Sequence, residues 1–150
     1  APQGENWTDY YADFKPSITL EIAVELLKEL QQQYNIDDKR LYVAGQSMGG
    51  FGAWSVIGKY PETFAAANPL CGGGNAANAR NLTKISVWAF HGEADETVEV
   101  ERSREMIEAI RKAGGNPKYT EYKGVGHSVW LQAFAEPEIV NWLFAQTKKQ

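Results

Sequence analysis

The chain has 150 residues, 43% of them hydrophobic and 12% aromatic, which suits one domain with a buried core and excludes a disordered segment. Nineteen acidic residues against fifteen basic ones give a net charge of −4, so no nucleic acid partner is expected, because phosphate binding needs clustered Lys and Arg. No apolar stretch approaches the ~20 residues of a membrane helix, so no membrane span is expected either. With one cysteine and two histidines, an internal disulfide, a thiolate metal cluster and a three-histidine metal site are excluded, and we expect neither a metal nor a cofactor.

The first predicted element is a helix that follows a polar segment, Ala1–Asp13, which we expect to be a loop. Ser17 is a residue type that caps free backbone donors at a helix start, and Asn35 is expected to end the helix in a left-handed conformation. Apolar residues recur every three or four positions, which predicts one apolar face. They are Ile22, Ala23, Leu26, Leu27, Leu30 and Tyr34.

The rest of the chain alternates short apolar runs with helical stretches. The expected strands are Leu41–Ala44, Phe64–Leu70, Ile85–Phe90 and Lys118–Tyr122. The expected helices are Phe51–Lys59, Glu101–Ala113 and one that begins near Pro137. Strands that alternate with helices predict an α/β domain with a mostly parallel sheet flanked by helices. No repeat or linker divides residues 1–150, which we interpret as a single domain.

A candidate nucleophile lies between the first predicted strand and the helix after it. Gly45-Gln46-Ser47-Met48-Gly49 matches G-x-S-x-G, the nucleophile elbow, in which a sharp turn lifts a serine above the sheet. Side chains at Gly45 and Gly49 are expected to collide with neighbouring backbone, and the Met48 amide is expected to face a developing oxyanion. Taken alone, the motif is equally consistent with a plain strand-to-helix turn.

Candidate partners for a serine follow the next two strands in the order Ser, acid, His that is typical of this elbow. Acids lie after Ile85–Phe90, within His91-Gly92-Glu93-Ala94-Asp95-Glu96, and His127 lies after Lys118–Tyr122. The carboxyl ends of parallel strands meet at one edge of a sheet, so these groups are expected to lie together. His127 is therefore the expected base, the acid is Glu93, Asp95 or Glu96, and His91 is expected to hydrogen-bond the loop backbone.

These blocks resemble the α/β-hydrolase superfamily, specifically serine carboxylesterases of the prolyl-oligopeptidase-like and dienelactone-hydrolase-like branch. The resemblance is carried by Gly45–Gly50, Tyr60-Pro61, Cys71–Gly74, His91–Asp95 and Gly124–Ser128. It implies a serine esterase for small-molecule acyl or aryl esters of short to medium chain length, with an acyl-enzyme intermediate. The resemblance also implies the role of each residue. Ser47 is the nucleophile and His127 the base, while Asp95 orients His127 and the Met48 amide binds the oxyanion.

Cys71 and the three glycines after it are interpreted as structural residues rather than catalytic ones. Dienelactone hydrolases carry a cysteine in the elbow; here Ser47 occupies that position, so Cys71 is expected to be buried packing. Gly72–Gly74 is expected to be a hinge near the pocket, and possible pocket-lining residues are Trp7, Gln46 and Trp130.

The resemblance also implies earlier strands and a loop with a second oxyanion donor, neither of which is found before the first helix. We therefore expect this chain to be the carboxyl-terminal part of an α/β-hydrolase domain that lacks its first strands. An additional amino-terminal segment would complete the sheet beside Leu41–Ala44. Two alternatives stay open: a non-catalytic remnant that binds a ligand or partner, and a serine peptidase.

Overall fold

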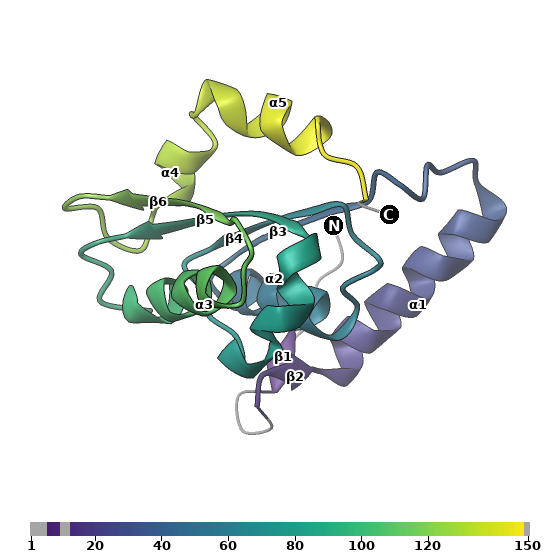
Figure 1. Cartoon of the computed structure of the whole chain (residues 1–150), viewed down its shortest axis with the longest axis horizontal. Coiled ribbons are helices and arrows are strands. Elements are labelled where there is room, and N and C mark those ends of the chain that lie inside the picture. Colours follow the sequence, from purple (N-terminus) through teal and green to yellow (C-terminus); the bar gives the residue numbers. More distant parts are fainter. Residues whose placement is uncertain (1–5, 10–12, 149–150) are drawn as a thin grey trace.

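The computed structural model describes residues 6–9 and 13–148, and its centre is a four-stranded parallel sheet in the order β3-β4-β5-β6. The strands are β3 (Tyr42–Gln46), β4 (Ala66–Leu70), β5 (Ser86–Gly92) and β6 (Lys118–Tyr122). The helices are α1 (Ile18–Gln33), α2 (Met48–Lys59), α3 (Glu101–Lys112), α4 (Trp130–Ala133) and α5 (Pro137–Phe144), with a 3₁₀ segment, η1, at Ala76–Lys84. In Figure 1, α4 and α5 cover one face of the sheet while α1, α2 and α3 cover the other. The predicted α/β fold class is confirmed. No helix in the described ranges is long and apolar enough to cross a membrane.

The core has two parts, one on each face of the sheet, and strand β5 contributes to both. Val87 and Ala89 belong to the cluster that includes Trp54 of α2 and Met106 of α3. The residues between and after them, Trp88 and Phe90, belong to the second cluster, together with Ile139 of α5. This division follows from the period of two in a strand, which sends successive side chains to opposite faces.

Strand β4, a central strand of the sheet, has a proline as its penultimate residue, where it cannot donate to the sheet. Pro69 lies opposite Gly45 of β3 in the parallel register, and the pairing of β4 with β5 is interrupted at Asn68 and Pro69. The buried side-chain amide of Asn68 donates instead to the carbonyl oxygen of Trp88, at 3.0 Å. The side chain of Asn68 therefore satisfies a β5 carbonyl next to the proline.

Helix α1 begins as predicted and ends differently. The hydroxyl oxygen of Ser17 accepts from the Leu20 N–H at 3.2 Å, which confirms the N-cap. The helix ends at Tyr34 in an extended conformation (φ −125°), so the expected left-handed end at Asn35 is wrong. Of the predicted apolar face, Ile22 and Leu26 are 63% and 47% exposed.

The prediction of a loop before α1 is wrong for part of the described residues. Thr8–Asp9 (β1) pairs antiparallel with Lys15–Pro16 (β2). The Thr8 hydroxyl donates to the Lys15 carbonyl oxygen at 3.1 Å, and the Ser55 hydroxyl of α2 donates to the Phe14 carbonyl oxygen at 2.6 Å. The second of these contacts joins residues 41 positions apart, so the local sequence pattern did not reveal the pairing. Residues 1–5 and 10–12 of the expected loop lie outside the described residues.

Candidate active site

Ser47 stands at the junction of β3 and α2 in a backbone conformation that few non-glycine residues adopt. Its φ is 56° and its ψ is −116°, and its N–H donates to the Leu70 carbonyl oxygen of β4 at 2.9 Å. Strain of this kind persists where the surrounding structure over-determines it. Helix α2 begins at Met48, so the Met48 N–H lies in the first turn, where N–H groups have no intrahelical acceptor and the helix dipole is positive.

Two glycines make the sharp turn possible: Gly45, which was expected, and Gly50, which was not. A Cβ at Gly45 would lie 2.1 Å from the Gly49 carbonyl oxygen, as predicted. A Cβ at Gly49 would meet none of the described atoms within 4 Å, whereas one at Gly50 would lie 2.2 Å from the Leu70 carbonyl oxygen. The steric requirement therefore falls on Gly45 and Gly50, because β4 passes behind the elbow at Gly50, and the expectation for Gly49 is corrected.

Three predicted site residues form one continuous chain of hydrogen bonds at the carboxyl ends of the strands. The Ser47 Oγ lies 2.9 Å from His127 Nε2, and His127 Nδ1 lies 2.8 Å from Asp95 Oδ2. The other carboxylate oxygen, Asp95 Oδ1, accepts the backbone N–H groups of Thr97 and Val98, each at 2.9 Å. Because a carboxylate only accepts, the neutral His127 ring carries its proton on Nδ1, and Nε2 is free to accept the serine proton.

Asp95 is the only one of the three candidate acids that contacts His127 in the described structure. Its side chain is buried, and burial acts to raise its pKa, but hydrogen bonds from the Val98 N–H, His127 and the Thr97 N–H outweigh burial and hold the pKa below its usual value. Asp95 therefore stays ionised at neutral pH. Glu93 and Glu96 are exposed, and Glu93 accepts the Gly124 N–H at 3.1 Å.

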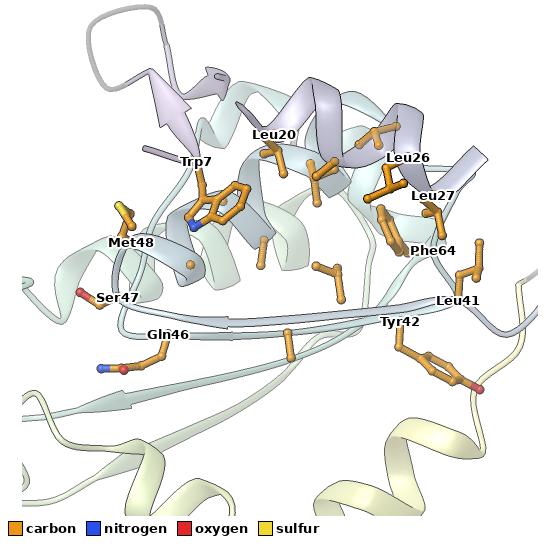
Figure 2. A pocket seen from close by; sticks show the side chains of 18 of the residues that line it. Trp7, Leu20, Leu26, Leu27, Leu41, Tyr42, Gln46, Ser47, Met48 and Phe64 are labelled. Carbon is orange, nitrogen blue, oxygen red and sulfur yellow. The ribbon is translucent and has the colours of Figure 1, made fainter. Parts of the chain in front are cut away.

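An apolar groove of about 670 Å³ runs between α1 and the edge strand β3 and ends at Ser47. In Figure 2, Trp7, Leu20 and Phe64 lie on the α1 side of β3, while Gln46 and Tyr42 point to the other side. Trp7 and Gln46 both border this groove, and their role in lining a substrate pocket stays a prediction. The Gln46 side-chain amide, on the far side of β3, donates to the His127 carbonyl oxygen at 3.2 Å. Trp130 does not line this groove; it packs against the core cluster under α4 and α5, and a pocket role for it stays a prediction.

The segment after β4 packs tightly against the site. Cys71 is fully buried, and burial raises the pKa of its thiol to about 12, so it stays protonated at neutral pH. The expectation of a hinge at Gly72–Gly74 is wrong: a Cβ at Gly72 would lie 2.6 Å from the Gly50 carbonyl carbon, so these glycines allow close packing. Among the described residues, the ligand atoms of Cys71, Asp95 and His127 lie within 4.8 Å of one another, close enough to share a metal ion. In this structure Asp95 hydrogen-bonds His127, and burial keeps the Cys71 thiol protonated.

The sequence profile of the dienelactone hydrolase family matches residues 6–138. The chain belongs to the dienelactone hydrolase family. This assignment confirms the resemblance inferred from the elbow and the strand-end blocks.

Individual relatives of this dienelactone hydrolase family member are longer proteins. The crystal structure of a thermostable esterase superposes with a TM-score of 0.92 and 36% identity over 95% of this chain and 41% of that one. A bifunctional acetylxylan esterase/xylanase of Neocallimastix patriciarum is 25% identical over 66% of this chain and 15% of its own length. Poly(3-hydroxyalkanoate) depolymerase C of Paucimonas lemoignei is 24% identical over 67% of this chain and 30% of its own. The chain thus spans less than half of each of these relatives.

Proposed function

We propose that the chain forms the nucleophile-bearing part of a serine carboxylesterase that hydrolyses short- to medium-chain acyl or aryl esters of small molecules. The observation that carries this proposal is the unbroken chain of hydrogen bonds from Ser47 through His127 to the buried carboxylate of Asp95. The membership of the dienelactone hydrolase family supports it, as does the likeness to a protein named as an esterase.

The role of each site residue follows from where its proton lies before the reaction and where that proton goes. The Ser47 Oγ attacks the ester carbonyl carbon while His127 Nε2 takes the serine proton, and the ionised Asp95 stabilises the imidazolium. The carbonyl oxygen becomes an oxyanion that accepts the Met48 N–H at the start of α2. The imidazolium then gives its proton to the departing alcohol, which leaves an acyl-enzyme on Ser47. A water molecule repeats the sequence: His127 takes its proton, and the acid leaves as Ser47 recovers its own.

We also propose that an amino-terminal segment completes the sheet beside β3. In the described structure β3 pairs only with β4, so the backbone groups along its other edge have no strand partner. An open, apolar strand edge invites pairing with another chain. The groove between β3 and α1 gives side chains of such a segment an apolar place to pack. Residues 1–150 produced alone should associate and be nearly inactive, whereas a full-length protein containing the segment should be monodisperse and active. A monodisperse and fully active 150-residue chain would contradict this.

The esterase proposal is tested with Ser47→Ala in the full-length protein, assayed on p-nitrophenyl esters of increasing acyl length. Loss of the nucleophile should lower kcat by several orders of magnitude, because the triad acts as a unit. Ser128→Ala is the matched control, since Ser128 is exposed and next to His127. Near-native hydrolysis by Ser47→Ala would contradict the proposal. A wild-type protein that cleaves only p-nitroanilide amides would favour the peptidase, and a folded but inert one would favour the binding remnant.

A further inference from the structure

A second imidazole lies against the Asp95 carboxylate besides that of His127. His91, the penultimate residue of β5, is fully buried, and its Nε2 lies 3.3 Å from Asp95 Oδ2. The same nitrogen lies 2.9 Å from the Val98 carbonyl oxygen, which confirms the expected hydrogen bond to the loop backbone. On its other side, His91 Nδ1 lies 2.7 Å from the Ser103 Oγ of α3. The expectation of a purely structural histidine did not include the contact with Asp95.

The positions of the protons follow from these partners. A carbonyl oxygen only accepts, so His91 Nε2 carries the ring proton that faces Val98 and Asp95. Burial lowers the pKa of His91 and outweighs the opposing effects of Val98 and Asp95, so the ring is neutral at pH 7 and Nδ1 is unprotonated. The Ser103 hydroxyl has one proton, which it shares between His91 Nδ1, 2.7 Å from Oγ, and the Gly72 carbonyl oxygen, 2.9 Å from Oγ. Ser103 thereby fixes which edge of the ring faces Asp95.

This arrangement holds the carboxylate from both sides. Asp95 Oδ1 is held by the backbone N–H groups of Thr97 and Val98. Those two bonds fix one oxygen and leave the carboxylate free to tilt about it. Asp95 Oδ2 receives the His127 Nδ1–H at 2.8 Å and lies 3.3 Å from His91 Nε2. This oxygen is therefore placed between the ring nitrogens of two histidines.

We propose that His91 is a positioning residue for the esterase reaction, with its Nε2–H holding Asp95 Oδ2 in line with His127. The proposal rests on the proposed function, since it concerns the same triad. A histidine that only packs would contribute stability and leave the chemistry of the folded fraction unchanged. A positioning residue affects kcat in the folded protein, because misplacement of a catalytic group by ~1 Å can cost ~10²-fold.

The experiment compares two replacements of His91 in the full-length protein. The amide nitrogen of His91→Asn takes the place of Nδ1 and faces Ser103, whereas that of His91→Gln takes the place of Nε2 and faces Asp95. Relative to wild type, His91→Asn should lower kcat about 10- to 100-fold with KM unchanged. The kcat of His91→Gln should be at least about tenfold higher than that of His91→Asn. Unfolding in urea, measured on the same samples, gives the folded fraction of each variant. Each kcat is then calculated per folded molecule.

Equal kcat values for His91→Asn and His91→Gln in the folded fraction would overturn the proposal. Ser47→Ala is measured in the same series so that this failure can be told apart from failure of the proposed function. If the proposed function were wrong, Ser47→Ala would be as active as wild type. Wild-type protein supplies a measurement that needs no variant to fold. Long-range ¹H–¹⁵N spectra should place the His91 proton on Nε2, and a proton found on Nδ1 alone would also overturn the proposal.

Discussion

Replacement of Gly92 by alanine should separate the two loops that carry the acid and the base. Gly92 ends β5, and a Cβ there would lie 2.2 Å from the Val125 carbonyl oxygen and 2.4 Å from that of Gly126. Ordinary carbon–oxygen contacts begin near 3.4 Å, so the loop of His127 must move by about 1 Å. A shift of that size breaks a 2.8 Å hydrogen bond between His127 and Asp95 and is expected to cost ~10²-fold in kcat. Overpacking against backbone should also lower the free energy of unfolding by about 1–3 kcal/mol.

The assay is kcat for a p-nitrophenyl ester beside urea denaturation, with Gly126→Ala as the matched control. Gly126 lies in the same loop, next to His127, but a Cβ there would make only an ordinary contact of 3.6 Å with the Ala94 carbonyl oxygen. It should therefore change stability by less than about 1 kcal/mol. Near-native kcat for Gly92→Ala, or an equal loss in both variants, would refute the steric reasoning.

Three further predictions concern stability and reactivity. Ser17→Ala removes the α1 cap and should lower the free energy of unfolding by about 1 kcal/mol, measured in urea; an unchanged midpoint would contradict the cap. Cys71, with its pKa raised to about 12 by burial, should react with iodoacetamide orders of magnitude more slowly in the native protein than in urea, and equal rates would show an accessible thiolate. The pKa of Asp95 is lowered by folding, so its contribution to stability is complete above the unfolded value of ~3.9 and is lost as the pH falls through the folded value. Asp95→Asn should therefore cost stability at pH 7 and less at pH 3, and a cost that does not vary with pH would contradict the shift.

The sheet and the proximity of Ser47, Asp95 and His127 were predictable because few arrangements satisfy their sequence pattern. Parallel strands put their carboxyl ends at one edge, so residues that follow β3, β5 and β6 must come close, whatever the loops do in detail. This reasoning brought Ser47 and His127 together with an acid after β5, and the choice of Asp95 over Glu93 came from the family resemblance. The β-branched and aromatic residues of Ile85–Phe90 predicted the strand β5, and its two faces fill the two core clusters.

The structural features that the sequence did not predict depend on contacts with residues that are distant along the chain. The pairing of β1 with β2 is supported by Ser55 of α2, 41 positions from its acceptor at Phe14. The requirement for glycine at position 50 comes from the Leu70 carbonyl oxygen on the neighbouring strand, and nothing in the G-x-S-x-G spacing indicates it. The contact of His91 with Asp95 likewise depends on how the loop after β5 folds back, which its local composition does not determine.

The most direct test of the central claim is to label the full-length protein with a fluorophosphonate and locate the adduct by peptide mass spectrometry. Only an activated serine is phosphonylated, so the account predicts one adduct per chain, on Ser47, that disappears in Ser47→Ala and forms far more slowly in His127→Ala. A folded protein that hydrolyses esters while Ser47 stays unlabelled, or that carries the adduct on another residue, would contradict the account.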